Sequence, residues 1–267
     1  MTPLAPAYPA YVISDVHLNV GDPQTLRLFL EFLQHDGFQA KTLVILGDLF
    51  DAWIGDDAAD NLAHQVASVL RRRHEQGTQI YFVPGNRDFL MGQAYCMTAG
   101  MKWVEEPVVL VGTDQATALI HGDRLCTDDH RYQRFREKTQ NPRWRARVLQ
   151  LPVWVRRLMR RWARWQSQRH GSRQQKHSPQ IMDINAQTVA EFAQAYGVER
   201  LIHGHTHRLG MHPATSPATP ERWVLGDWHA GQGSYMAVKP EGCALYTLSL
   251  NAQMHLTQAR LEPPPTH

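Results

Sequence analysis

Five short stretches of the chain carry side chains that bind divalent cations. They are Asp15-Val16-His17, Gly47-Asp48-Leu49-Phe50-Asp51, Gly85-Asn86-Arg87-Asp88, His121-Gly122-Asp123 and Gly204-His205-Thr206-His207. These stretches offer carboxylate, carboxamide and imidazole donors and no thiolate, a mixture that favours Mn²⁺ first, with Mg²⁺, Fe²⁺, Co²⁺ or Zn²⁺ as alternatives. Any one stretch is a weak signal, whereas the five in this order predict a metal site of the kind that hydrolyses phosphoanhydrides or phosphodiesters.

The spacing inside the stretches bears on how they reach an ion. In an extended segment, residues i and i+2 point to the same side of the backbone. Asp15 and His17 are therefore expected to converge on one ion, and His205 and His207 have the same spacing. Glycines at 47, 85, 122 and 204 permit tight turns and a close approach to an ion or phosphate. We expect Asp51, Asp88 and Asp123 to orient ligands or cap turns. His203 is expected to pack in the core or to support a ligand, and Asp227 and His229 are expected to have no role.

The elements that must position these stretches are strands that precede them. Short β-branched and apolar runs indicate buried strands at residues 11–14, 42–46, 79–83, 116–120, 200–202 and 222–225. Helical patterns lie between several of them, at residues 25–35, 61–76 and 185–196, the last with Asn185 as its N-cap and Gly197 at its end. Such alternation is typical of a layered α/β sandwich. Because ligands of open α/β sheets bind at the carboxyl ends of strands, the sheet is expected to gather the five stretches.

One segment departs from this alternation and differs in charge. Residues 131–176 hold 15 of the 28 lysines and arginines, with Glu137 as their one acidic residue, so the rest of the chain has 13 basic against 24 acidic residues. This asymmetry indicates a polyanionic partner, such as phosphate-rich lipid or nucleic acid. Residues 123–180 show no strand pattern and hold four of the eight tryptophans. We interpret residues 124–180 as a basic, tryptophan-rich helical lid inserted into one domain that spans residues 1–267.

Cysteine use and hydropathy bear on the location of the protein. Cys96, Cys126 and Cys243 are widely spaced and form no C-x-x-C pair, which argues against a disulfide framework or a thiolate metal site. No stretch approaches the ~18 apolar residues of a membrane-spanning helix, and the first ten residues lack the pattern of a signal peptide. We therefore expect a cytoplasmic protein.

The motifs D-x-H, G-D-x-x-D, G-N-x-D, H-G-D and G-H-x-H together resemble those of the calcineurin-like metallophosphoesterases, over residues 13–207. The resemblance implies a sandwich of two mixed sheets flanked by helices. It implies two metal ions, one held by Asp15, His17 and His207, the other by Asn86, His121 and His205, with Asp48 as a bridge. Such a metal pair lies roughly 3.5 to 4 Å apart, polarises a phosphoryl group and activates water for in-line attack. The expected catalytic residues are Asp48, Asn86, Arg87 and His121.

Arg87 is a departure from the common family pattern, in which a histidine follows the asparagine. An arginine does not donate a proton usefully at neutral pH. It does hold phosphate with two hydrogen bonds and neutralise developing charge. A phosphate monoester, with a second pKa near ~6, leaves without being protonated. Arg87 therefore favours cleavage of a phosphoanhydride.

Longer stretches are similar to one branch of that family, the pyrophosphohydrolases of lipid A biosynthesis. They are ISDVHL, GDLFDAWIGDD, VPGNRDF, HGDRLCTDD, IMDIN and LIHGHTHR. The similarity implies that UDP-2,3-diacylglucosamine is hydrolysed to 2,3-diacylglucosamine 1-phosphate and UMP with Mn²⁺, at the cytoplasmic side of the inner membrane. It also implies substrate contacts by Asn86, Arg87, Asp129, Ser167, Lys176 and His205, with Ser172 as the alternative to Ser167.

The lid sequence supports a lipid substrate on separate grounds. Leu151, Val155, Leu158, Trp162 and Trp165 fall at helical spacing on one face, with arginines at 156, 157, 160, 161 and 164 elsewhere around the helix. Cationic amphipathic helices of this kind lie in membrane interfaces, so we expect peripheral contact with an anionic membrane. The alternatives are a helix that packs on the body, a nuclease or nucleotide phosphodiesterase that uses the basic segment, and a scaffold without activity. The intact ligand set argues against a scaffold, and nucleic acid is not the expected partner.

Overall fold

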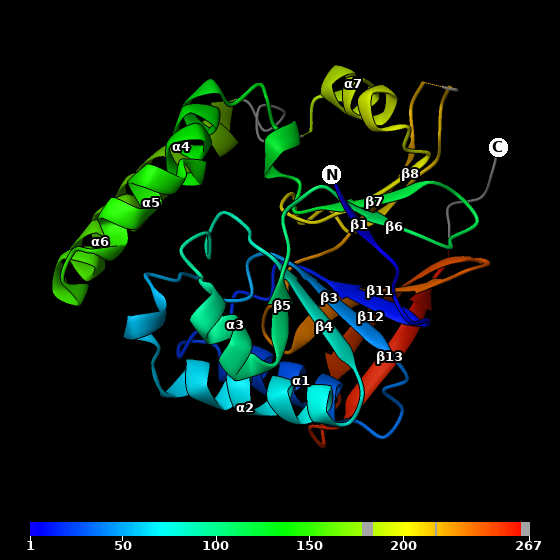
Figure 1. Ribbon diagram of the computed structural model, residues 1–267, viewed down its shortest axis with the longest axis horizontal. Coiled ribbons are helices and arrows are strands. Elements are labelled where there is room, and N and C mark those ends of the chain that lie inside the picture. The colour runs from blue at the N-terminus through cyan, green and yellow to red at the C-terminus, as the bar shows by residue number, and fades with distance from the viewer. Residues whose placement is uncertain (178–183, 217, 263–267) are drawn as a thin grey trace.

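Two mixed β-sheets lie face to face, with helices on both outer sides (Figure 1). The computed structural model describes residues 1–177, 184–216 and 218–262, and the side chains of residues 166–177 lie outside this description. Within it, the seven-stranded sheet has the order β13-β12-β11-β2-β3-β4-β5. Its parallel strands are β2 (Ala10–Ile13), β3 (Thr42–Leu46), β4 (Gln79–Val83) and β5 (Met101–Trp103). The antiparallel strands that continue it are β11 (Gln232–Lys239), β12 (Gly242–Leu250) and β13 (Leu256–Leu261).

The second sheet has six described strands in the order β1-β6-β7-β8-β10-β9. They are β1 (Thr2–Leu4), β6 (Val108–Leu110), β7 (Thr117–Ile120), β8 (Arg200–His203), β10 (Glu221–Val224) and β9 (Gly210–His212). The strands β7, β8 and β10 are parallel to one another, and β6 and β9 run antiparallel to their neighbours β7 and β10. Both sheets are mixed, so the expected α/β sandwich of two mixed sheets is confirmed.

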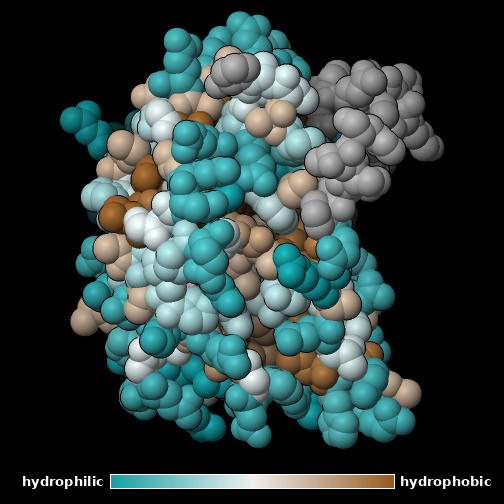
Figure 2. Space-filling view, turned by 90° about the vertical axis from the view of Figure 1, so that its right-hand side faces the viewer, coloured by the Kyte–Doolittle hydropathy of each residue, from teal (hydrophilic) through white to brown (hydrophobic). Residues whose placement is uncertain are grey.

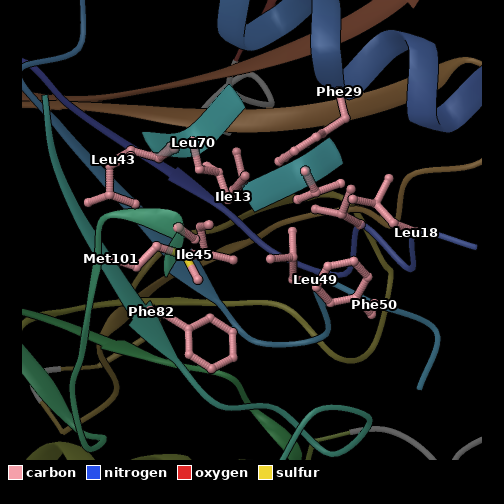
Figure 3. Packing of buried hydrophobic residues seen from close by; sticks show 14 of the residues in the cluster. Ile13, Leu18, Phe29, Leu43, Ile45, Leu49, Phe50, Leu70, Phe82 and Met101 are labelled. Carbon is pink, nitrogen blue, oxygen red and sulfur yellow. The ribbon is translucent and has the colours of Figure 1, made fainter. Parts of the chain in front are cut away.

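The central strands are hydrophobic on both faces because each face meets a different layer. Leu43 and Ile45 of β3 point to the outer helices, whereas Val44 and Leu46 point to the other sheet. The outer cluster, part of which Figure 3 shows, joins β2, β3 and β4 to α1 (Pro23–Gln34), α2 (Asn61–Glu75) and α3 (Gln93–Ala99). A third cluster packs α7 (Ala186–Tyr196) on the six-stranded sheet. Each large side chain buried in these layers stabilises the fold by about 1.5–3 kcal/mol.

The predicted strands and helices are confirmed to within two residues at either end. The patterns at 42–46 and 79–83 coincide with β3 and β4. Asn185 caps α7 by accepting the Thr188 N–H at 3.1 Å, and Gly197 ends it in the left-handed region. The sequence patterns did not indicate α3, the long strands β11 and β12, or short and polar strands such as β13, which pairs with β12 at an exposed edge of the sheet.

Three consecutive helices lie beside the sheets rather than on them, at the left of Figure 1. They are α4 (His130–Gln140), α5 (Pro142–Leu149) and α6 (Val153–His177), which we call the helical segment. No helix among the described residues is both long and apolar enough to cross a membrane. The apolar side chains Trp154, Leu158, Trp162 and Trp165 of α6 are exposed at helical spacing. Leu151, expected on this face, precedes the helix.

Arg156 does not share the solvated, cationic surface expected for the arginines of α6. Its side chain is 2% exposed. The guanidinium binds the Asp57 carboxylate with two nitrogens, and it donates to the Ile54 carbonyl at 2.5 Å and the Leu151 carbonyl at 2.9 Å. Gly55 makes room for it, since a Cβ there would lie 2.1 Å from Arg156 Nη1. Arg156 therefore attaches α6 to the loop that follows β3.

Replacing Arg156 by alanine is expected to lower the free energy of unfolding by about 1–3 kcal/mol, because two partly buried carbonyls lose their donor and Asp57 its partner. Asp57 is 57% exposed, so solvent screens the ion pair and keeps the loss below that of a fully buried pair. Urea unfolding measures the free energy of unfolding of Arg156→Ala and of the control Arg157→Ala, in which an exposed neighbouring arginine is replaced. Equal stabilities of the two variants would contradict this attachment.

Candidate metal site

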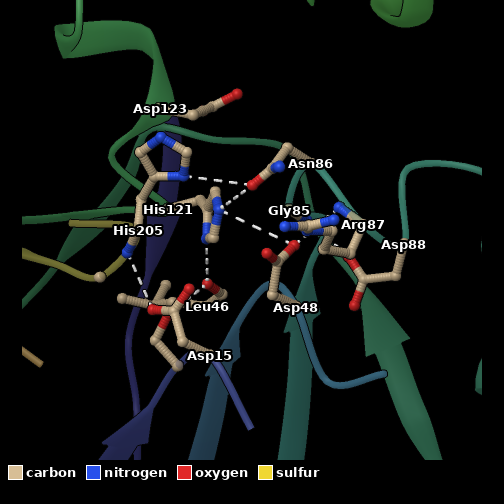
Figure 4. Close-up of polar contacts among 12 residues, drawn as sticks. Asp15, Leu46, Asp48, Gly85, Asn86, Arg87, Asp88, His121, Asp123 and His205 are labelled. Atoms are coloured by element: carbon tan, nitrogen blue, oxygen red, sulfur yellow. Dashed lines mark hydrogen bonds and ion pairs between the residues drawn. The ribbon is translucent and has the colours of Figure 1, made fainter. Parts of the chain in front are cut away.

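The five motifs meet where the carboxyl ends of strands from both sheets come together. Asp15, Asp48 and Asn86 follow the parallel strands β2, β3 and β4 of the seven-stranded sheet. His121 and His205 follow β7 and β8 of the other sheet, also parallel neighbours. Figure 4 shows these side chains pointing toward one another from the strand ends. The expected gathering of the motifs at this edge is confirmed.

The backbone of the site is held in a conformation that side chains rarely adopt. Positive φ values occur at Asp15 (54°), His17 (52°), Asp48 (54°), His205 (66°) and His207 (57°), and at just two other non-glycine residues of the described chain. Such strain concentrates at functional sites, where the surrounding structure enforces it. The expectation that Asp15 and His17 lie on an extended segment is therefore wrong, because both residues have left-handed backbone angles.

One set of donors surrounds the carboxylate of Asp15. Its Oδ1 atom lies 3.3 Å from His207 Nε2 and 3.8 Å from His17 Nε2, and the two imidazole nitrogens are 3.4 Å apart. Asp15 is fully buried, and Oδ1 accepts no hydrogen bond from the described residues. A buried carboxylate oxygen without a hydrogen bond, faced by two imidazole nitrogens, fits a cation between them.

A second set of donors centres on the carboxamide of Asn86. Its Oδ1 lies 2.9 Å from His121 Nε2 and 3.1 Å from His205 Nδ1. His121 is fully buried, and its other ring nitrogen, Nδ1, lies 2.8 Å from the Leu46 carbonyl oxygen. A hydrogen bond from Nδ1 to that carbonyl leaves Nε2 with a lone pair directed into the site. His205 and His207, which share a motif, thus belong to different sets.

Asp48 lies between the two sets. Its Oδ1 is 3.8 Å from His121 Nε2 and accepts the Arg87 N–H at 2.8 Å. Asp15, Asp48 and His121 each offer one ligand atom within 4.8 Å of the others, so the groups of donors adjoin. The arrangement fits two neighbouring cations with a shared carboxylate.

The supporting residues hold the ligands by backbone contacts. Asp88 accepts the N–H groups of Leu49 and Gly85 at 2.8 Å each, which ties the loop of Asp48 to that of Asn86. Gly204 approaches the site so closely that a Cβ on it would lie 2.0 Å from Asp15 Oδ2. His203 is buried and contacts the Gly204 carbonyl through Nδ1, as a packed histidine does.

Burial and neighbouring charge shift the pKa values of the site. Burial raises the pKa of Asp48 to about 8 and lowers the pKa values of His17 and His205 to about 4. Burial also lowers the pKa of His121, but the carboxylates of Asp48 and Asp15 outweigh this effect and raise the pKa to about 10. A bound cation would compete with protons for these groups, because it binds the deprotonated carboxylate and the neutral imidazole.

The residues expected to bind substrate lie around this centre. Arg87 has an exposed side chain beside Asp48. Asp129 is the N-cap of α4, and its carboxylate accepts the Tyr132 N–H at 2.9 Å. Ser167 and Lys176 belong to α6, but their side chains lie outside the described residues, as does that of Ser172.

Two carboxylates near the site were not expected from the sequence. Asp227 Oδ2 lies 3.7 Å from His207 Nδ1 and 3.2 Å from His229 Nδ1. It follows β10 as the other motifs follow their strands, and that position is the signal that could have found it. Glu106 accepts the His121 N–H at 2.9 Å, and no sequence pattern indicates this contact.

Known proteins with similar sequences belong to a family of phosphoesterases, as the proposed metal ligands suggest. Residues 8–209 match the calcineurin-like phosphoesterase family. The chain belongs to this family. It is 41% identical over 231 residues to the UDP-2,3-diacylglucosamine hydrolase of Chromohalobacter salexigens, covering 86% of this chain and 93% of that protein. It is also 41% identical over 242 residues to the UDP-2,3-diacylglucosamine hydrolase of Neisseria meningitidis serogroup B, covering 90% and 98%.

Proposed function

We propose that the protein hydrolyses the pyrophosphate bond of UDP-2,3-diacylglucosamine, giving 2,3-diacylglucosamine 1-phosphate and UMP in lipid A biosynthesis. The observation that carries the proposal is the pair of donor sets that meet at Asp48. The choice of substrate is supported by the relatives named UDP-2,3-diacylglucosamine hydrolase, whose similarity covers most of the chain.

Two divalent ions, which we propose to be Mn²⁺, would polarise the phosphoryl group and activate water for attack. The chain would hold them with the seven donors described above, namely Asp15, His17 and His207, then Asn86, His121 and His205, and Asp48 between the sets. The fit rests on the buried Asp15 Oδ1 without a hydrogen bond and on ring nitrogens directed into the site.

Arg87 supports cleavage of a phosphoanhydride. Its N–H binds Asp48, so its exposed guanidinium starts from the edge of the site and can reach a phosphate there. The guanidinium binds phosphate oxygens in pairs and neutralises the charge that develops on them. Both proposed products are phosphate monoesters, whose second pKa is near ~6, so neither needs a proton to leave.

The helical segment would act as a lid that takes up the acyl chains and contacts an anionic membrane. Seven of the thirteen exposed large hydrophobic residues of the described chain lie in it: Phe135, Leu149, Trp154, Leu158, Met159, Trp162 and Trp165. On the face shown in Figure 2, which is turned away from the helical segment, apolar residues form only small, separate groups. Exposed tryptophans beside arginines favour insertion at a lipid headgroup surface. We therefore propose a peripheral position on the cytoplasmic side of the inner membrane.

Release of UMP from UDP-2,3-diacylglucosamine in detergent tests the proposal. Purified protein with Mn²⁺ is expected to release UMP, to lose this activity on chelation and to regain it with added Mn²⁺. Cleavage of DNA or RNA with an inert lipid substrate would instead favour the nuclease alternative. Turnover of a simple phosphodiester without UMP release would keep the chemistry and reject the substrate.

Membrane contact makes a separate prediction for the tryptophans of α6. Replacing Trp154 and Trp162 by glutamate is expected to weaken binding to phosphatidylglycerol vesicles at least about tenfold, because two interfacial anchors become anionic. Replacement of both by phenylalanine is the control and retains most of the binding. Cosedimentation measures it, and equal binding of the glutamate variant and the wild type would rule out these anchors.

A further inference from the structure

A buried cluster of charged side chains joins α4 to the strand ends of the metal site. Arg136 of α4 donates through Nε to Asp123 Oδ2 at 2.9 Å and through Nη2 to Glu106 Oε1 at 2.8 Å. The three side chains are 14%, 7% and 10% exposed, respectively. One guanidinium therefore bridges two carboxylates that come from the body of the protein.

Both carboxylates also lie next to candidate metal ligands. Glu106 Oε2 accepts the backbone N–H of His121 at 2.9 Å. Asp123 Oδ2 accepts the Tyr132 hydroxyl at 2.7 Å, and the Tyr132 ring lies 5.6 Å from the His205 ring, centroid to centroid. Figure 4 shows Asp123 next to His205 at the edge of the site. Arg136 thus contacts neither histidine, and the carboxylates of Glu106 and Asp123 lie between it and them.

The contacts of Arg136 are specific to an arginine. Its planar fork presents Nε and Nη2 to two acceptors in fixed directions, whereas a lysine ammonium is a point charge at the end of a flexible chain. Removing one partner from a buried ion cluster leaves the others without compensation and costs more than losing an exposed pair.

The remote end of the helical segment is held differently. Arg160 and Arg164 of α6 pair with Asp51, but these arginine side chains are 42% and 52% exposed. Exposed pairs of this kind contribute little and are screened by salt. Arg156 fixes the start of α6 to the loop after β3, and the contacts of Arg136 are the buried ion pairs that fix α4 beside the site.

We propose that Arg136 is a positioning residue, which sets the distance of α4, with Tyr132 and the N-cap Asp129, from Asn86 and His205. The proposal rests on the proposed function, in which substrate binds between the helical segment and the metal site. A displacement of about 1 Å between groups that hold a substrate can lower its turnover about 10²-fold. The residue would matter for a substrate that contacts both parts and not for one that contacts the metal site alone.

Arg136→Lys tests this by a comparison of two substrates. Its kcat/KM for UDP-2,3-diacylglucosamine is expected to fall about 10²-fold. Hydrolysis of bis(p-nitrophenyl) phosphate, a small soluble diester, is expected to change less than about threefold, with Mn²⁺ content unchanged. Arg134→Lys, at an exposed position of the same helix, is the matched control. Equal losses on both substrates, or no loss on either, would overturn the proposal.

A second variant and a second measurement keep the test decisive if Arg136→Lys folds poorly. Asp123→Asn retains an oxygen for the Tyr132 hydroxyl and removes the charge that Arg136 meets, so kcat/KM for the lipid is expected to fall less than in Arg136→Lys. Amide hydrogen exchange is expected to be faster in α4 of either variant and unchanged in α7. If the wild type does not cleave the lipid, the proposed function fails, and unchanged exchange in α4 would still refute the positioning role.

Discussion

Replacing Asp48 by asparagine is expected to lower kcat for UMP release by about 10³-fold, because the shared carboxylate between the two donor sets loses its charge. Asparagine keeps an oxygen for the Arg87 N–H and has no charge to bury, so the melting temperature of the metal-free protein is not expected to fall. Metal analysis of the variant is expected to show fewer than two Mn²⁺ per chain.

Asp60→Asn is the matched control for this substitution. It makes the same chemical change at the N-cap of α2, where asparagine caps as well as aspartate and where no candidate ligand lies. The test compares kcat and bound Mn²⁺ per chain in Asp48→Asn and Asp60→Asn. If Asp48→Asn kept wild-type kcat with two bound ions, the role of the shared carboxylate would be refuted.

Replacing Gly204 by alanine is the second substitution with a large expected effect. The new Cβ would lie 2.0 Å from Asp15 Oδ2 and 2.1 Å from Ser14 Oγ, so the Asp15 carboxylate must move. Since Asp15 faces His17 and His207, the movement is expected to lower kcat about 10²-fold and weaken Mn²⁺ binding. Overpacking of this kind costs about 1–3 kcal/mol, so the melting temperature is also expected to fall.

Gly210→Ala provides the comparison for that substitution. A Cβ at Gly210 would meet its nearest neighbour, the Arg208 carbonyl oxygen, at 3.9 Å, which is ordinary contact. This variant is expected to keep wild-type kcat and metal content. Titration of Mn²⁺ into both proteins measures the affinities, and a Gly204→Ala protein that binds Mn²⁺ as tightly as Gly210→Ala would contradict the close approach.

The order of the buried strands and the position of the motifs could be predicted because both are local in sequence. An apolar run of four or five residues followed by Asp48 or Asn86 identifies a strand and its end without any distant contact. The helix ends at Asn185 and Gly197 are equally local. These features established the fold class and the region of the site.

The features that could not be predicted depend on contacts between distant residues. The left-handed backbone at Asp15 and Asp48 has no sequence pattern of its own, and it occurs where the two loops hydrogen-bond to each other, from the Asp15 N–H to the Gly47 carbonyl. Glu106 and Arg136 are thirty residues apart, and the fold alone brings them together. Arg156 looks like any arginine of an amphipathic helix, and only a loop about a hundred residues away, with Gly55 and Asp57, buries it.

The division of the proposed donors between two sheets has a consequence for the size of ion that the site would fit. Asp48 is carried by one sheet and His121 by the other, and the layer between them is filled by side chains such as Leu46 and Ile202, which never meet an ion. The thickness of that hydrocarbon layer therefore helps to set the separation of oxygen and nitrogen atoms on its rim. Changes of volume among these aliphatic residues are therefore expected to alter the spacing of the seven proposed donors, and with it the size of cation that they would fit.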